Sequence, residues 1–284
     1  MSIHAQVSVA RQRLRDAGIT PTESDLDARL LAQHVLGWTT ERFLTDAREP
    51  VPDGFTPRYD ALVARRVTRE PLAYIVGVRE FWGLELEVTP DVLIPRAATE
   101  LIVEAVQELF PDRSVPLTIA DVGTGCGCVA VAIAYERRSA LVEATDISRP
   151  ALAVARRNAA RHGVGDRIVF THGDLLDGLH GVFDAIVANP PYVIDRARPA
   201  LQPEVRDHEP SVALFGGVDG LGLVARLVSA APERLRSGGY LIFEFGLGQD
   251  LEIEHLIERS PELTLVDLRR DLQGIARTAI ARRR

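Results

Sequence analysis

The sequence contains no lysine, so all 33 of its basic residues are arginine. We attribute this absence to the base composition of the coding DNA rather than to function. Acidic residues outnumber basic ones and the formal net charge is -7, which argues against a protein that holds nucleic acid through a broad basic surface. A local basic groove is still compatible with this balance.

Long apolar runs are also missing. The apolar stretches are broken by charged residues and stay well short of the roughly 18 consecutive apolar residues that a membrane span requires. Residues 1–10 show no basic start followed by an apolar core, as a signal peptide would. We therefore expect a cytoplasmic protein with no membrane partner.

Cysteine is scarce, with Cys126 and Cys128 as the whole complement. They lie too close together for an ordinary structural disulfide, and two thiols are too few for a zinc site, so we expect no metal. What the chain does have is a composition of 46% hydrophobic and 26% charged residues over 284 positions. This is typical of a soluble globular protein and favours two domains over one.

The beginning of the chain has a different pattern from the rest. Up to about residue 69, amphipathic stretches at 7–17, 25–36 and 57–67 predict a small helical domain. Residues 72–94 read as extended around two glycines, which predicts a β-hairpin. We place the helical domain at residues 1–70, the linking hairpin at 71–95 and a second domain at 96–284.

Beyond residue 99, strand-like apolar segments alternate with helical ones such as 129–137 and 151–162. This alternation predicts an α/β domain with a doubly wound, mostly parallel sheet. Too few residues separate the last two strands for a helical crossover, so we expect them to pair antiparallel. The expected strands are 117–122, 141–145, 167–171, 183–188, 240–245, 263–268 and 275–281.

Asn189-Pro190-Pro191-Tyr192 follows directly after the fourth of these strands, where open α/β sheets place their chemistry. The prolines keep the preceding residues extended and carry no N–H group. The Asn189 side-chain oxygen and the Pro190 carbonyl can therefore converge on one planar –NH2 group, while the Tyr192 ring covers its face. Such a corner fits a nitrogen that must act as a nucleophile, although an ordinary Asn-Pro turn is the simpler alternative.

A glycine-rich turn, residues 123–127, separates the first strand from its helix, where glycines let the backbone approach a ligand. Asp146 closes the next strand, where a ribose-binding carboxylate is expected. The glycine spacing is not that of a dinucleotide site. Asp121, just before the turn, would repel a pyrophosphate but could accept hydrogen bonds from a cationic amino-acid end. The pattern favours S-adenosylmethionine.

A third acidic residue, Asp174, follows the third strand and could reach the adenine, with Leu175 packing on the face of the ring. A cap at the end of the strand explains Asp174 equally well. The expected cofactor-binding residues are Asp121, Gly123, Thr124, Gly125, Cys126, Gly127, Asp146, Asp174, Leu175 and Asn189.

Together these motifs resemble the amino methyltransferases that use S-adenosylmethionine. Other segments are similar to one family among them, the peptide chain release factor N5-glutamine methyltransferases (PrmC/HemK family), and the similarity spans nearly the whole chain. Outside the two motifs it is carried by residues 69–77, 81–83, 92–96, 201–205, 208–210, 213–214, 216–217, 219–221, 238–244, 246, 249, 271–274 and 277.

This resemblance implies a Rossmann-like methyltransferase domain with a seven-stranded, mostly parallel sheet, preceded by a helical domain that recognises the substrate. The implied reaction moves a methyl group from S-adenosylmethionine to the side-chain N5 of the glutamine in the Gly-Gly-Gln loop of class 1 release factors. S-adenosylhomocysteine is the other product. Asn189, Pro190 and Tyr192 would be catalytic, and Asn189, Pro190, Pro191 and Tyr192 would contact the substrate. We expect a monomer that binds no nucleic acid directly.

One segment departs from the family pattern. After Pro95-Arg96 the family usually has Pro-Glu-Thr-Glu, whereas this chain has Ala97-Ala98-Thr99-Glu100. Loss of a carboxylate at Ala98 would weaken any contact that it makes near the cofactor or substrate. Three other functions stay open: a methyltransferase for a ribosomal-protein glutamine, one for a nucleic-acid base, or a binding protein without turnover. A DNA enzyme would also need a target-recognition region, and no basic, aromatic-rich segment is evident.

Overall fold

The computed structural model describes residues 2–284 and divides the chain into two compact units. The smaller unit comprises the residues up to Gly77 together with Gln202–His208. The larger unit comprises Val78–Leu201 with Glu209–Arg284. A short segment of the later chain thus belongs to the first unit, which no sequence pattern predicts. Across residues 2–284, no helix combines the length and the apolar character that crossing a bilayer would require.

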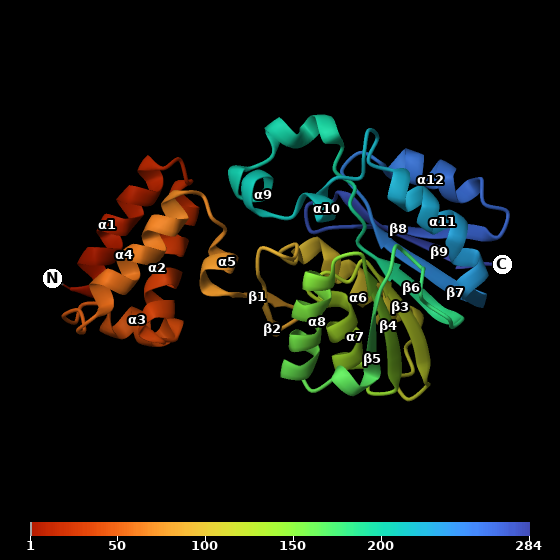
Figure 1. Cartoon of the computed structure of the whole chain (residues 1–284), viewed down its shortest axis with the longest axis horizontal. Helices are drawn as coiled ribbons and strands as arrows, with labels where there is room; N and C mark the ends of the chain where they lie inside the picture. Colours follow the sequence, from red (N-terminus) through yellow and green to blue (C-terminus); the bar gives the residue numbers. More distant parts are fainter. Residues whose placement is uncertain (1) are drawn as a thin grey trace. The chain divides into compact units, whose positions relative to one another are not determined.

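Helices build the smaller unit. They are α1 (Ile3–Asp16), α2 (Pro21–Leu36), α3 (Thr40–Asp46), α4 (Phe55–Val67), α5 (Leu72–Val76) and α9 (Pro203–His208). α1, α2 and α4 pack side by side, and their apolar faces enclose a core that includes Val7 and Leu31 (Figure 1). The Phe55 and Tyr59 rings stack there with their centroids 5.0 Å apart. The buried Tyr59 hydroxyl donates to the Ala28 carbonyl, so its polar end is satisfied.

Local sequence sets most of these helix ends. Thr20 and Thr39 cap α2 and α3 through side-chain oxygens that accept backbone N–H groups. Gly37 ends α2 with a φ of 63°, a left-handed conformation that glycine adopts without strain. The three helices predicted for this region correspond to α1, α2 and α4.

The extended pattern expected at residues 72–76 is wrong, because this segment forms α5. Gly77 ends the helix with a φ of 80°. Tyr74 and Ile75 are buried, and this packing outweighs the strand preference of their aromatic and branched side chains. The predicted hairpin follows directly, as β1 (Val78–Phe81) pairs antiparallel with β2 (Leu84–Glu87) in the larger unit.

The larger unit contains a seven-stranded sheet with the order β5-β4-β3-β6-β7-β9-β8. Neighbouring strands pair parallel from β5 to β7, whereas β9 pairs antiparallel with both β7 and β8. The mostly parallel sheet and its antiparallel end are therefore confirmed. The strands are β3 (Leu117–Val122), β4 (Ala140–Asp146), β5 (Ile168–His172), β6 (Phe183–Ala188), β7 (Leu235–Glu244), β8 (Leu263–Arg270) and β9 (Ala276–Arg283).

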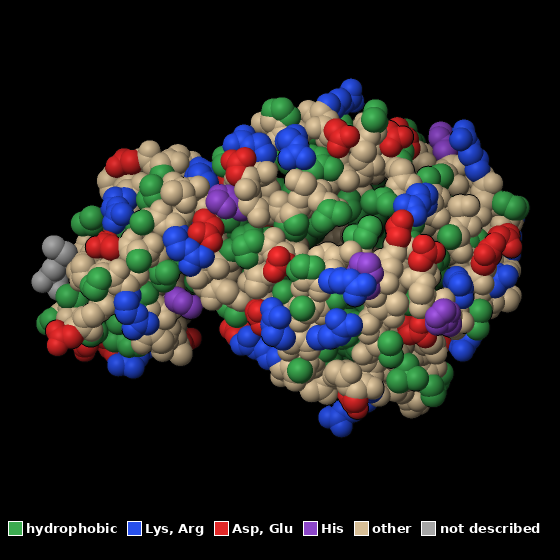
Figure 2. All heavy atoms as spheres, viewed as in Figure 1, with side chains coloured by type: hydrophobic (Ala, Val, Ile, Leu, Met, Phe, Trp, Pro, Cys, Tyr) green, Lys and Arg blue, Asp and Glu red, His purple; other side chains and the backbone are tan. Residues whose placement is uncertain are grey.

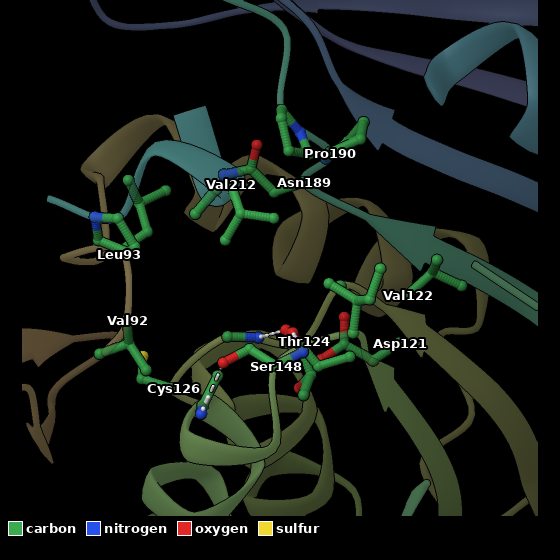
Figure 3. Close-up of a pocket in the computed structure, with 18 of the residues that line it drawn as sticks. Val92, Leu93, Asp121, Val122, Thr124, Cys126, Ser148, Asn189, Pro190 and Val212 are labelled. Atoms are coloured by element: carbon green, nitrogen blue, oxygen red, sulfur yellow. Dashed lines mark hydrogen bonds between the residues drawn. The ribbon is translucent and has the colours of Figure 1, made fainter. Parts of the chain in front are cut away.

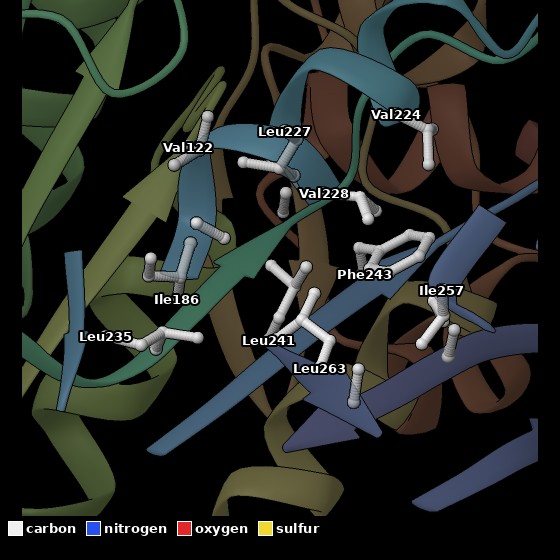
Figure 4. Packing of buried hydrophobic residues seen from close by; sticks show 14 of the residues in the cluster. Val122, Ile186, Val224, Leu227, Val228, Leu235, Leu241, Phe243, Ile257 and Leu263 are labelled. Carbon is white, nitrogen blue, oxygen red and sulfur yellow. The ribbon is translucent and has the colours of Figure 1, made fainter. Parts of the chain in front are cut away.

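Helices cover both faces of this sheet (Figure 1). On one face, α7 packs between α6 and α8. On the other, α11 and α12 lie over a core in which Leu227 and Val228 meet Ile186, Leu241 and Phe243 (Figure 4). The helices are α6 (Glu100–Leu109), α7 (Cys128–Glu136), α8 (Arg149–Arg161), α10 (Ser211–Leu214), α11 (Gly222–Arg234) and α12 (Asp250–Glu258).

The strand order reverses between β3 and β6, since the chain adds β4 and β5 on one side of β3 and β6 and β7 on the other. Loops that leave the carboxyl ends of β3 and β6 therefore diverge at this point. In open α/β sheets such a switch point opens a crevice for ligands. The glycine-rich turn follows β3 and Asn189 follows β6, so the fold brings the two predicted motifs to the same crevice.

Candidate active site

A cavity of about 320 Å³ lies at the carboxyl ends of the parallel strands. Its walls come from the loops after β3, β4, β5 and β6, from residues 91–96 with Thr99, from residues 210–215 and from α11. Asn189 and Pro190 lie on one side of it, and Asp121, Thr124 and Ser148 lie on the opposite side (Figure 3). Figure 2 shows a hollow in the face of the larger unit, and hydrophobic side chains border it.

The glycine-rich turn lines this cavity with its backbone. Gly123, Gly125 and Gly127 have φ values of 72°, 57° and 83°, a backbone conformation that residues other than glycine rarely adopt. A Cβ atom on Gly127 would also come 3.1 Å from the Ala155 Cβ, so glycine there lets α7 and α8 approach closely. The sequence therefore needs glycine both to form the turn and to pack it.

Asp121 is buried beneath the turn, with 2% of its surface exposed. Its Oδ2 atom accepts hydrogen bonds from the Thr124 hydroxyl at 2.6 Å and from the Ala130 backbone N–H at 3.1 Å. Within residues 2–284 its Oδ1 atom receives none, although the residue lines the cavity. Burial raises the pKa of Asp121 to about 6, and these two hydrogen bonds only partly offset the desolvation. A cation in the cavity would complete this site.

Asp146 lies on the same side, at the end of β4. Its two carboxylate oxygens accept the backbone N–H groups of Gly125 and Ser148, each at 2.8 Å. Burial raises the pKa of Asp146 despite these bonds. A carboxylate can accept about four hydrogen bonds in all, so Asp146 keeps acceptor positions for hydroxyl groups of a ligand.

The structure also brings Asp174 and Leu175 to the cavity wall, where Asp174 pairs with Arg226 of α11 at 2.7 Å. Leu175 has a φ of 52°, and its carbonyl accepts a hydrogen bond from the Thr145 hydroxyl. Cys126 lines the cavity as well, so every residue of the predicted cofactor set lies on its wall with one exception. That exception is Gly127, whose effect on the turn is structural.

Asn189, Pro190 and Pro191 form the opposite wall. The Asn189 Nδ2 atom donates a hydrogen bond to the Thr99 hydroxyl oxygen at 3.0 Å, which turns its Oδ1 atom away from Thr99. Neither this Oδ1 atom nor the Pro190 carbonyl accepts a hydrogen bond from any residue among 2–284. Two acceptors from successive residues are thus available at the wall.

Tyr192, by contrast, is not part of the cavity wall. Its hydroxyl donates to the Glu244 carboxylate at 2.8 Å, and its carbonyl accepts a hydrogen bond from Gln249. An added Cβ on Gly246 would come 3.1 Å from the Tyr192 ring, so the ring packs tightly beside that glycine. These contacts show what holds Tyr192. Its predicted position over the substrate nitrogen stays a prediction.

Sequence reasoning did not assign Thr99, Glu244 or Arg226 to the site. Glu244 could have been found by the rule that found Asn189, because it ends β7, the neighbour of β6 in the sheet. Nothing in the sequence indicates that Arg226, in the middle of α11, reaches the cavity. The divergent residues Ala97 and Ala98 lie outside the cavity wall, although Arg96 and Thr99 on either side belong to it.

Comparison with known proteins places this geometry in a family. The model of the PrmC N-terminal domain matches residues 7–77, and that of the methyltransferase small domain matches residues 96–204. A release factor glutamine methyltransferase from Neisseria gonorrhoeae is 40% identical over 260 residues, covering 90% of this chain and 93% of that protein. The chain belongs to the release factor glutamine methyltransferase family.

Other release factor glutamine methyltransferases match along nearly their whole length. The protein of this name from Bradyrhizobium diazoefficiens is 38% identical, covering 99% of this chain and 95% of its own. That from Coxiella burnetii is also 38% identical, covering 100% and 99%. The similarity thus includes the helical unit, the hairpin and the sheet.

Solved structures confirm the methyltransferase fold. A methyltransferase from Pyrococcus furiosus covers 77% of this chain and 96% of its own, with a TM-score of 0.52 and 19% identity. A 16S ribosomal RNA methyltransferase from T. thermophilus, solved with AdoMet and guanosine, has a TM-score of 0.52 and 19% identity, covering 73% and 50%. At 19% identity these structures show only that the chain shares their fold.

Proposed function

We propose that this chain transfers a methyl group from S-adenosylmethionine to the side-chain N5 of the glutamine in the Gly-Gly-Gln loop of class 1 release factors. The observation that carries the proposal is the orientation of Asn189. Its amide nitrogen is engaged by Thr99, so its oxygen and the neighbouring Pro190 carbonyl are two acceptors on one wall of the cavity. A primary carboxamide has two N–H donors on one nitrogen that match this pair.

The residues of the opposite wall fit S-adenosylmethionine. Asp121 is a buried carboxylate with no cationic partner among residues 2–284, and the ammonium group of the methionine moiety would provide one. Asp146 would accept hydrogen bonds from the ribose hydroxyls. Asp174 and Leu175 would contact the adenine. When bound, the sulfonium of this molecule supplies an electrophilic methyl group.

The chain's own residues act by positioning. An amide nitrogen is a weak nucleophile because its lone pair is delocalised into the carbonyl. Asn189 Oδ1 and the Pro190 carbonyl would accept both N–H bonds of the glutamine, which fixes the nitrogen and increases its electron density. Fixing two reactants in a productive geometry can lower a barrier by several kcal/mol. No general base is needed, because methyl transfer to the neutral amide first gives a positively charged, N-methylated amide, which is acidic enough to lose one N–H proton to water.

The helical unit would contact the release factor outside the reacting loop. A large protein substrate allows such remote contacts to contribute to binding. Whole release factor should then be a better substrate than a Gly-Gly-Gln peptide, and added salt should reduce this advantage. Equal salt dependence for both substrates would assign the helical unit a structural role only. We further propose that the chain acts in the cytoplasm as a monomer.

The direct test incubates the purified protein with S-adenosylmethionine carrying a labelled methyl group and a class 1 release factor, followed by mass analysis of the Gly-Gly-Gln peptide. The proposal expects one methyl group on the glutamine. A release factor with this glutamine replaced by alanine is the matched control and should stay unlabelled. Label in a ribosomal protein or in RNA, with none in the release factor, would overturn the substrate assignment.

A further inference from the structure

Glu244 is a buried carboxylate that the proposed reaction does not use directly. It ends β7, and 1% of its surface is exposed. Its Oε2 atom accepts a hydrogen bond from the Thr99 hydroxyl at an oxygen–oxygen distance of 2.6 Å. Its Oε1 atom accepts one from the Tyr192 hydroxyl at 2.8 Å. Burying a carboxylate is costly unless its oxygens find donors, and among residues 2–284 these two hydroxyls are its donors.

Thr99 connects Glu244 to Asn189. The Thr99 side chain is 2% exposed and lies between the two, with its oxygen 2.6 Å from the Glu244 carboxylate and 3.0 Å from the Asn189 amide nitrogen. The three residues come from three parts of the chain: the turn before α6, the loop after β6 and the end of β7. Because β6 and β7 are neighbouring parallel strands, Asn189 and Glu244 lie side by side at the carboxyl ends of these strands.

The number of hydroxyl protons decides how this chain of hydrogen bonds is oriented. Burial raises the pKa of Glu244, and the hydrogen bonds from Thr99 and Tyr192 oppose this shift. In its ionised form the carboxylate only accepts hydrogen bonds, and a threonine hydroxyl has one proton to donate. Since Thr99 donates that proton to Glu244, its oxygen can only accept from Asn189. The Asn189 amide must then present its –NH2 group to Thr99 and its oxygen elsewhere.

The opposite orientation would oppose the proposed reaction. If Thr99 donated its proton to the Asn189 oxygen, the amide would rotate and present an –NH2 group to the cavity. Two –NH2 groups, those of Asn189 and of the substrate glutamine, cannot donate to one another. Only the orientation that Glu244 imposes leaves an acceptor for the substrate.

We propose that Glu244 and Thr99 are positioning residues that fix the Asn189 amide with its oxygen toward the substrate nitrogen. This inference rests on the proposed function, since it assumes that a carboxamide is the group bound at Asn189. Neither residue touches the reacting atoms. Glu244 also holds the Tyr192 hydroxyl, so the tests address the effect that passes from Thr99 to Asn189, as distinct from a general contribution of a buried cluster to stability.

The test compares Thr99→Val, which removes the hydroxyl at similar volume, with Thr99→Ser, which retains it. We expect Thr99→Val to lower kcat about a hundredfold, the loss that a small misplacement of a reacting group can cause. The KM for S-adenosylmethionine should change little, whereas the melting temperature should fall, because Thr99→Val leaves an oxygen of the buried Glu244 without its donor. Thr99→Ser should recover most of the lost kcat. An unchanged kcat in Thr99→Val would overturn the inference.

A double variant tests whether Thr99 acts through Asn189. In an Asn189→Ala background, Thr99→Val should have no further effect on kcat, because the group that it positions is already gone. If Thr99→Val lowers kcat by the same factor in both backgrounds, its role is independent of Asn189 and the inference fails.

A spectroscopic readout does not depend on turnover. The side-chain amide resonances of Asn189, assigned by their loss in Asn189→Ala, should shift in Thr99→Val and return in Thr99→Ser. Unchanged resonances in Thr99→Val would contradict the hydrogen bond. If the wild-type protein transfers no methyl group to release factor, the proposed function fails, but this shift still tests the orientation of the amide.

Discussion

The side-chain nitrogen of Asn189 lies 3.0 Å from the hydroxyl oxygen of Thr99, although 90 positions separate the two residues in the sequence. This contact ties the loop after β6 to the turn before α6. It also decides which atom of the Asn189 amide is available to a ligand, so the chemistry of the corner depends on a residue outside the Asn-Pro-Pro-Tyr motif.

Replacing Asn189 with alanine should separate binding from catalysis. The side chain would contact the substrate nitrogen, so Asn189→Ala should retain affinity for S-adenosylmethionine and lose kcat by about a hundred- to a thousandfold, the range found when one oriented polar group is removed from an active site. Calorimetric titration with S-adenosylmethionine and steady-state kinetics with release factor measure the two quantities. Near-normal turnover would remove the proposed mechanism.

Asp146→Ala should have the opposite effect. Loss of hydrogen bonds from a charged acceptor costs about 1.5–3 kcal/mol, which corresponds to a ten- to hundredfold weaker affinity for S-adenosylmethionine. The apparent KM for this substrate should rise, while kcat at saturation changes little. Asp146→Asn keeps the side-chain size and one of the two oxygens that accept from Gly125 and Ser148, so it serves as a milder control for damage to the turn. Unchanged affinity in Asp146→Ala would show that the ribose lies elsewhere.

Asp121→Asn should change the pH dependence of stability. The pKa of Asp121 is raised from 3.8 to about 6, chiefly by burial, so the protonated carboxyl favours the folded state. The stability that this gives is present below about pH 4 and lost as the pH rises to about 6, a difference of about 3 kcal/mol. In the absence of ligand, Asp121→Asn should therefore be more stable than wild type at pH 7.5 and lack this fall.

Denaturant unfolding at pH 4 and pH 7.5 compares the two proteins. The same variant should bind S-adenosylmethionine more weakly, because a neutral amide cannot pair with an ammonium group. Thr124→Val is the contrasting variant, because it removes a hydrogen bond to Asp121 but leaves the carboxylate of Asp121 in place. Identical pH profiles for wild type and Asp121→Asn would refute the buried, titrating carboxylate.

In the smaller unit, Arg66→Ala should be strongly destabilising. Arg66 is 5% exposed and pairs with Asp27 at 2.7 Å and with Glu204 at 2.8 Å. Removing one partner from a buried ion pair leaves uncompensated charge and costs about 3–5 kcal/mol. Arg65→Ala is the matched control, since the Arg65 pair with Glu70 is exposed on the arginine side and worth about 1 kcal/mol or less. Denaturant unfolding of both variants gives the comparison, and equal losses would contradict it.

The sequence predicts the sheet well because its strands are buried apolar runs with clear ends. β3 and β6 match the expected limits, and β7 differs because it begins at Leu235, before the expected start at residue 240. Gly238 and Gly239 weaken the strand pattern there, and the pairing with β6 shifts register between Phe183 and Ala185. Local pattern cannot show this, since the register depends on the neighbouring strand.

The sequence predicts only those parts of the site that lie within a single segment of the chain. Motifs such as the glycine turn and Asn189-Pro190 are contiguous, so a single segment reveals them. Thr99, Glu244 and Arg226 reach the site only because the fold brings distant segments together. The pairing of Glu204 with Arg66 and Arg69 likewise requires residues 202–208 to join the helical unit, which no local pattern indicates.

The most direct test of the central claim is a crystal structure of the protein with S-adenosylhomocysteine and a release factor carrying the Gly-Gly-Gln loop. We expect the glutamine nitrogen within hydrogen-bond distance of both Asn189 Oδ1 and the Pro190 carbonyl, on the side that faces the sulfur. A glutamine amide bound elsewhere, or a sulfur atom that points away from Asn189, would contradict the account.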